Sequence, residues 1–253
     1  MNETEIKYLA GLLDADGHIG FAYGQNRVRL EITLTAADSV DQKGYVLALP
    51  ALTSFGSSCT KSKRVTTWGQ VHQWRVTSRR DINMLVPRLL KHMVIRGQHL
   101  ERMYDQWLHY DGHFIDELTK SQLKEFVAAS RRGTGPVKAK KHPTWAWTAG
   151  YLDGDGSFIY KKAPSQKSPR MLVQATCHEM DRPGIDLLHK AFGGNIYNRG
   201  KHGTHILDWR HALGVKNQQF AEHFLSKIVQ HSKLKKHKIE QLLAHVHSRT
   251  RTD

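Results

Sequence analysis

YLAGLLDADG, residues Tyr8 to Gly17, is the stretch that decides the fold, because a close copy, TAGYLDGDG, returns at Thr148 to Gly156. Each copy predicts a short helix that ends in two acidic residues and a glycine. The closing aspartates, Asp16 and Asp155, lie 139 residues apart, about the length of one domain. We therefore expect two similar units, each beginning with one of these two motif helices.

The repeat extends beyond the motifs. The same shift of 139 residues aligns four further pairs in the second part of each unit, namely His92 with His231, Arg96 with Lys235, Leu100 with Ile239 and Glu101 with Glu240. A sequence that matches itself at a fixed offset over this distance indicates a repeated architecture.

Small residues recur on one face of each motif helix. Gly11 and Ala15 are four residues apart, as are Gly150 and Gly154, so each pair shares a helical face. Such faces let two helices approach more closely than the usual 8–10 Å between axes. We expect the motif helices to pack against each other there, and Gly17 and Gly156 to be the C′ residues that end them.

The closing acids are unusual at a helix end. A carboxylate in the last turn faces the negative end of the helix dipole, at a cost of about 0.3–1 kcal/mol. If the helices pack in register, Asp16 and Asp155 also repel each other. A divalent cation would relieve both problems, and paired carboxylates with Mg²⁺ are suited to phosphoryl displacement. The alternative is two unrelated helix ends with solvated acids, and the repetition at domain spacing favours the metal site.

These residues resemble a known family. Leu9 to Gly17 matches the LAGLIDADG homing endonuclease signature except at Leu13, and Thr148 to Gly156 is a looser match. Two signatures in one chain are similar to the monomeric, pseudo-symmetric branch, and the resemblance covers about residues 5–247.

The resemblance implies a site-specific endonuclease that makes a double-strand break with short 3′ overhangs in DNA. Two half-sites of one helical turn each give a target of about 20 bp, which should not be palindromic because the two units differ at predicted base-facing positions. Asp16 and Asp155 would bind Mg²⁺, with Ala15 and Gly154 as neighbouring metal ligands, and metal-activated water would attack each strand. Mn²⁺ is expected to substitute, and Ca²⁺ to support binding without cleavage. Such genes are often intron-encoded.

Basic residues near the start of the last helix of each unit are further catalytic candidates. The family places a basic residue at the start of the helix after the fourth strand, where Lys233 and Lys235 fall in the second unit and Arg96 in the first. A cation there would stabilise transition-state charge or orient water. The alternative is that these residues only contact phosphates.

Patterning along the chain predicts the order α, β-β, α, β-β, α, α in each unit. In the second strand Val28, Leu30, Ile32 and Leu34 alternate with Arg27, Arg29, Glu31 and Thr33. The pattern predicts an α/β (α+β) fold of two αββαββα units with antiparallel sheets. The resemblance implies that the sheets form a DNA-binding saddle and that the motif helices join the two units. The expected domains are 1–110 and 145–253, with 111–144 as a linker that contains a helix near 114–130 and a basic segment.

The charge of the chain favours a polyanionic partner. Lys and Arg total 38 against 23 Asp and Glu, which gives a net charge of +15. Arg and Lys on the predicted strands point to double-stranded DNA, although a solvated sheet face is the alternative. The residues expected to contact DNA are Arg27, Arg29, Lys61, Lys63, Arg75, Lys161, Arg170, Gln174, Asn198, Arg199 and Arg210.

Other features bound the setting of the protein. No apolar run approaches the ~20 residues of a membrane span, and we do not expect the acidic start to be a signal or a transit peptide. Two cysteines imply no disulfide framework, so we expect a reducing compartment such as the cytoplasm or the matrix of a mitochondrion or chloroplast.

Two rival functions stay open at this point. The same fold could serve an intron-RNA maturase, with intron RNA as partner, or a DNA-binding protein that does not cleave. Retention of both aspartates favours the nuclease, since neither is needed for binding alone. A strand-biased nickase is a third possibility, because the basic residues of the two units differ.

Overall fold

The structure is a computed structural model. It describes residues 1–24, 27–36, 40–66, 69–110, 113–132, 143–161, 170–178, 182–198, 204–211 and 215–249, although not every side chain within these ranges. No helix among the described residues is long and apolar enough to cross a membrane.

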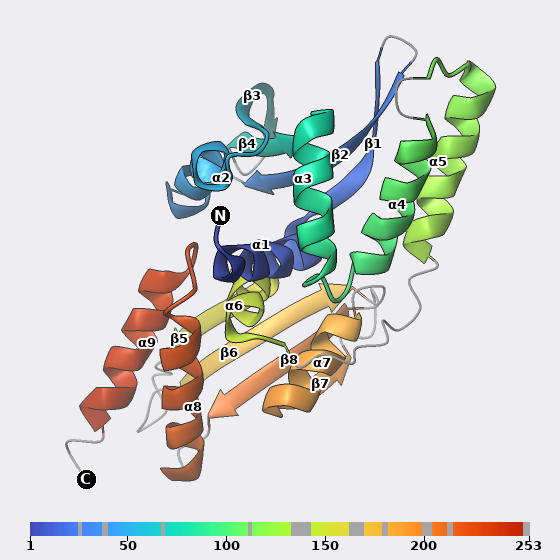
Figure 1. Cartoon of the computed structure of the whole chain (residues 1–253). Helices are drawn as coiled ribbons and strands as arrows, with labels where there is room; N and C mark the ends of the chain where they lie inside the picture. The colour runs from blue at the N-terminus through green and yellow to red at the C-terminus, as the bar shows by residue number, and fades with distance from the viewer. Residues whose placement is uncertain are drawn as a thin grey trace.

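The first unit follows the predicted order of elements. It comprises α1 (Glu3–Asp16), β1 (His18–Gly24), β2 (Arg27–Ala36), α2 (Val40–Thr53), β3 (Ser57–Thr66), β4 (Gly69–Val76), α3 (Arg79–Leu90) and α4 (Gly97–Tyr110). A further helix, α5 (Glu117–Arg132), lies where the sequence predicts one and packs beside α4 and β1 (Figure 1).

The second unit repeats this order. It comprises α6 (Trp145–Asp155), β5 (Gly156–Lys161), β6 (Arg170–His178), α7 (Arg182–Phe192), β7 (Asn195–Asn198), β8 (Thr204–His211), α8 (Val215–Ile228) and α9 (Lys236–Arg249).

Each unit contains one antiparallel sheet of four strands. The strand order is β1-β2-β4-β3 in the first sheet and β5-β6-β8-β7 in the second, so the two topologies are the same. Ile32 pairs with Val76 in the first sheet, and Val173 pairs with Trp209 in the second. The fold class predicted from the sequence is confirmed at the level of two equivalent antiparallel sheets with flanking helices.

The alternation in β2 sorts its side chains onto two faces. Val28, Leu30, Ile32 and Leu34 are buried against the helices, whereas Arg27 and Arg29 are exposed. Thr33 departs from the predicted exposed pattern, because it is buried between its partners His18 in β1 and Arg75 in β4. A polar residue at the centre of a sheet can be covered by its neighbours even on the face without helices.

Local capping explains where the motif helices begin. The side chain of Asn2 accepts a hydrogen bond from the Glu5 N–H at 3.0 Å, and the Glu5 carboxylate accepts one from the Asn2 N–H at 2.8 Å. This reciprocal capping box satisfies amides at the start of α1. The Thr144 hydroxyl accepts from the Trp147 N–H at 3.2 Å and plays the same part for α6.

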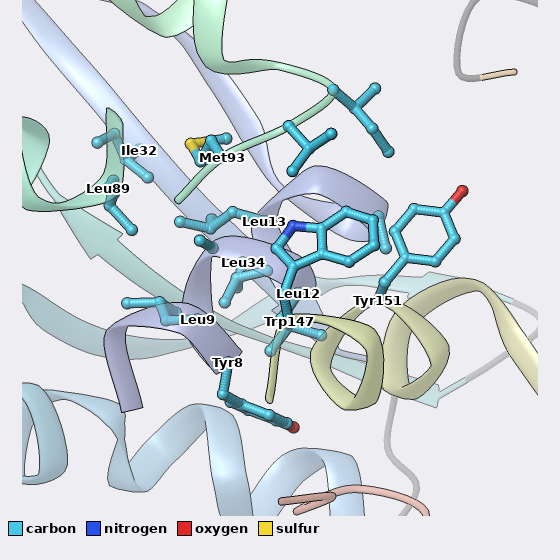
Figure 2. Close-up of a cluster of buried hydrophobic side chains, with 14 of the residues drawn as sticks. Tyr8, Leu9, Leu12, Leu13, Ile32, Leu34, Leu89, Met93, Trp147 and Tyr151 are labelled. Atoms are coloured by element: carbon cyan, nitrogen blue, oxygen red, sulfur yellow. The ribbon is translucent and has the colours of Figure 1, made fainter. Parts of the chain in front are cut away.

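The motif helices α1 and α6 lie side by side at the centre of the molecule, between the two sheets (Figure 1). Their side chains join the cores of both units into one cluster. Figure 2 shows Leu12 and Leu13 of α1 beside Trp147 of α6, and Trp147 stacks on Tyr151 with ring centroids 5.2 Å apart. The C-terminal ends of both helices are thereby fixed relative to each other.

Candidate active site

The motif helices approach until backbone meets backbone. A β-carbon at Gly11 would collide with the carbonyl of Trp147, standing 2.8 Å from its carbonyl carbon. A β-carbon at Gly150 would collide in the same way with the carbonyl of Tyr8, 3.0 Å from its carbonyl carbon. Since residues 8 and 147, like 11 and 150, are related by the shift of 139, the contact is symmetric.

The second pair of small residues brings the acidic ends together. A β-carbon at Gly154 would lie 2.5 Å from Cβ of Ala15 and 3.2 Å from Oδ2 of Asp16. The Asp16 carboxylate of the first unit therefore rests against the residue that precedes Asp155 in the second.

The glycines after the motif helices end them, as the sequence predicts. Gly17 and Gly156 are the C-cap residues, one position earlier than the predicted C′, and their backbone is extended, at φ −69° and −88°. Space is the physical reason for glycine. A β-carbon at Gly17 would be 2.7 Å from Cα of Leu13, and one at Gly156 would be 2.8 Å from Cα of Leu152.

Arg96 and Lys235 reach back to these helix ends from equivalent positions. The Arg96 guanidinium donates to the carbonyls of Gly17 and, at 3.1 Å, of Ala15. The Lys235 ammonium donates to the carbonyls of Leu152 at 3.1 Å, Gly154 at 2.8 Å and Gly156 at 2.6 Å. Cations at a helix C-terminus complement its dipole and satisfy its free carbonyls.

The electrostatics of the site couple these groups. Although Asp16 is exposed at the surface, the protein around its carboxyl displaces enough water to raise its pKa, and the cations Lys235 and Arg96 act to lower it. Burial lowers the pKa of the Lys235 ammonium, and the charges of Asp153, Asp16 and Asp155 oppose this shift. Acids from both units therefore act on one lysine, so the site is shared between the units.

A second pair of aspartates, to which the sequence assigns no role, is buried beneath the site. Asp14 accepts hydrogen bonds from the backbone N–H groups of Val94 at 2.7 Å, Ile95 at 3.2 Å and Arg96 at 2.8 Å. These amides belong to the N-terminal basic loop, residues 93–96, which leads into α4. An aspartate at this position in both motifs, Asp14 and Asp153, is the sequence signal that could have indicated this role.

Asp153 does the same in the second unit. It accepts from the Ser232 hydroxyl at 2.6 Å and from the backbone N–H groups of Lys233 at 2.7 Å, Leu234 at 3.0 Å and Lys235 at 3.1 Å. These residues form the C-terminal basic loop, 232–235, which leads into α9. Lys233, one of the predicted catalytic residues, is exposed and anchored through its backbone, whereas Lys235 also points its side chain into the site.

The predicted DNA-contacting residues lie mainly on the strands. Arg27 and Arg29 are exposed on β2, Gln174 is partly exposed on β6, and Asn198 ends β7. The backbone places Lys61 and Lys63 in β3, Lys161 in β5, Arg170 in β6 and Arg210 in β8, while Arg199 lies outside the described residues.

Two of these arginines already have partners within the chain. The Arg75 guanidinium forms an ion pair with Glu31, so the sheet face carries acid as well as base. Arg27 lies over the exposed ring of Phe114, 5.4 Å from its centroid. Both contacts orient the side chains without burying their charge.

The oxygen atoms at the helix ends fit a hard divalent cation. No group of three or more His, Cys, Asp or Glu side chains in the described residues could hold a metal ion. The donors available are instead the Asp16 and Asp155 carboxylates with the carbonyls of Ala15 and Gly154, and Mg²⁺ and Ca²⁺ prefer oxygen ligands. Both carbonyls already accept hydrogen bonds from cationic side chains, which indicates that positive charge is favoured here.

Solved structures share this architecture, although neither a sequence-family model nor a curated relative matches the chain. The fold is that of the LAGLIDADG homing endonucleases, with two units in one chain.

Three particular structures illustrate the similarity. The meganuclease I-AabMI bound to uncleaved DNA is 13% identical, with a TM-score of 0.69 over 99% of this chain and 93% of that one. The homing endonuclease I-GzeII in complex with its DNA target is 15% identical, with a TM-score of 0.61 over 95% and 96%. I-SmaMI bound to uncleaved DNA in the presence of calcium ions is 16% identical, with a TM-score of 0.59 over 97% of each chain.

Proposed function

We propose that the protein is a site-specific DNA endonuclease that cuts both strands of a long, non-palindromic site and leaves short 3′ overhangs. The target would span about 20 bp, with one helical turn read by each unit. The protein would act as a monomer, since one chain supplies both units.

The observation that carries this proposal is the meeting of Asp16 with the Gly154–Asp155 end of the second motif helix. Two acids and two cations, Arg96 and Lys235, gather where both helices end. Nothing in packing alone requires acids at the negative end of two helix dipoles. Phosphodiester hydrolysis does use this combination of charges.

Different residues of the chain would bind the DNA and stabilise the charge of the transition state. Arg27 and Arg29 of the first sheet, with Gln174 and Asn198 of the second, would hold the DNA backbone and bases across the two sheets. Lys235 and Arg96 would stabilise the charge that develops on each scissile phosphate or orient the attacking water.

Asp16 and Asp155, with the carbonyls of Ala15 and Gly154, would hold Mg²⁺. When bound, the metal would supply Lewis-acid stabilisation and a water of lowered pKa. Arg96 and Lys235 donate to these same carbonyls, so the residues proposed to act on phosphate adjoin the proposed metal ligands. Mn²⁺ should substitute for Mg²⁺, and Ca²⁺ should support binding alone.

The experiment is cleavage of a partly randomised DNA library by purified protein with Mg²⁺, followed by sequencing of the cut ends. Enrichment of one long site with staggered 3′ ends supports the proposal and identifies the target. Salt-sensitive binding to DNA or to intron RNA without any Mg²⁺-dependent product would favour the non-cleaving alternatives. Cuts confined to one strand would point to a nickase.

A further inference from the structure

Each motif helix is hydrogen-bonded to the buried aspartate of the other unit. The Tyr8 hydroxyl in α1 donates to Oδ2 of Asp153 in α6 at 2.7 Å. The Trp147 indole N–H in α6 donates to Oδ2 of Asp14 in α1 at 2.9 Å. Tyr8 and Trp147 are equivalent under the shift of 139, as are Asp14 and Asp153, so the two bonds are reciprocal.

The same two aspartates also accept hydrogen bonds from the basic loops. Asp14 holds three consecutive backbone amides of the N-terminal basic loop, the last of them from Arg96. Asp153 holds three amides and one hydroxyl of the C-terminal basic loop, and the last amide belongs to Lys235. A chain of direct hydrogen bonds therefore runs from Tyr8 to the loop of Lys235, and from Trp147 to the loop of Arg96.

Burial makes each of these bonds hard to replace. Asp14 is 0% exposed, Asp153 1%, Trp147 2% and Tyr8 3%. Water cannot reach the carboxylates to substitute for a lost donor, and an ionised group in such a place depends on every hydrogen bond it accepts.

The two units differ in how well the loop is held. Asp153 has the additional Ser232 hydroxyl at 2.6 Å, and the equivalent position in the first unit is Met93, which has no donor in its side chain. The Trp147 bond is therefore one of four to Asp14, whereas the Tyr8 bond is one of five to Asp153. Loss of the Trp147 donor should affect its loop more.

We propose that Tyr8 and Trp147 are positioning residues that act across the interface between the units. Tyr8 of the first unit fixes the loop that carries Lys235, and Trp147 of the second unit fixes the loop that carries Arg96. Each half of the site is thus held in place by the opposite unit. The consequence for DNA cleavage rests on the proposed nuclease function.

The first test measures backbone amide exchange, which does not depend on nuclease activity. In Tyr8→Phe, exchange should accelerate about tenfold in residues 233–235 and stay unchanged in 94–96. In Trp147→Phe the pattern should reverse. Matched controls are Tyr104→Phe, which removes a 2.8 Å bond to Asn83, and Trp74→Phe, which removes a 2.9 Å bond to the Phe55 carbonyl; neither should affect the basic loops.

The second test measures the cleavage of each strand under single-turnover conditions, together with DNA affinity. Lys235→Met and Arg96→Met identify the strand that depends on each basic residue. Tyr8→Phe should slow the Lys235-dependent strand roughly tenfold, since small displacements near a reacting centre can cost up to ~10²-fold. DNA affinity should stay unchanged, which a general loss of structure would not allow.

The outcomes separate this inference from the proposed function. Faster exchange in the loop of the same unit, in both loops equally or in neither would overturn the crossed arrangement. If Trp147→Phe does not fold, Tyr8→Phe alone decides, because it removes a single hydroxyl. A wild-type protein that cuts no DNA would refute the nuclease proposal, while the exchange pattern would still decide whether positioning crosses the interface.

Discussion

Gly11 of α1 lies directly against the backbone carbonyl of Trp147 in α6, with no room for a β-carbon between them. The carbonyl is part of a helix and cannot rotate away, unlike the end of a flexible side chain. This contact sets the distance between the motif helices, and with it the distance between the acids at their ends.

Gly11→Ala should therefore destabilise the protein. Alanine favours a helix over glycine by about 1 kcal/mol, but overpacking against a fixed backbone typically costs about 1–3 kcal/mol, and here the overlap is with main chain. The difference between the two terms is a net loss of up to about 2 kcal/mol, so we expect Tm to fall by up to roughly 8 °C in thermal unfolding followed by circular dichroism. Gly24→Ala is the control, because nothing lies within 4 Å of its β-carbon position. Equal Tm values for both variants would contradict the close packing.

Replacing Asp16 or Asp155 by Asn should abolish cutting of at least one strand and leave DNA binding in Ca²⁺ largely intact. Both residues lie at the helix ends, where the neutral amide keeps the shape of the carboxylate and loses its charge. Strand-specific labels on a target DNA would report each cut, and a titration in Ca²⁺ would report the affinity. Full activity in either variant would refute the assignment of that aspartate.

Much of the fold follows from patterns that repeat within the sequence. The motif stretches, the alternation from Val28 to Leu34 and the second-unit copy together predict the elements and their order. Lys235 follows Arg96 by 139 residues, so the sequence also predicts that the two lie at equivalent places. Their side chains do contact equivalent helix ends.

The sequence could not show which partner each buried group finds. The sequence assigns no role to Asp14 and Asp153, yet the fold buries them under backbone amides that lie 80 residues further along the chain. The bonds from Tyr8 and Trp147 depend on the crossing of two helices, which periodicity within one helix does not encode. The Arg75–Glu31 ion pair likewise depends on the register of β2 and β4, which only the folded sheet defines.

The pKa of Asp16 should respond to Lys235 and not to Lys233. Because the Lys235 ammonium lowers the pKa of Asp16, Lys235→Met should raise it further, so the carboxyl stays protonated to a higher pH. Carbon-13 NMR titration of the Asp16 carboxyl measures this directly. Lys233→Met is the control, since that side chain is exposed and does not act on Asp16. If the pKa of Asp16 rises in Lys233→Met and not in Lys235→Met, then Lys233 is the lysine that acts on Asp16.

Binding to DNA should depend steeply on salt. If about ten phosphates are neutralised, the slope of log K against log salt is about −9. Arg29→Ala should make this slope smaller in magnitude by roughly 1, because Arg29 is exposed on the sheet. Each phosphate contact that is lost lowers the number of counterions released on binding by about one. Arg182→Ala is the matched control, since Arg182 pairs with Asp186 on α7, which packs against the helix-covered face of the second sheet. A fluorescence titration at several salt concentrations gives both slopes. A wild-type slope near zero would exclude a DNA-binding surface on the sheets, and an equal change in both variants would mean that only net charge matters.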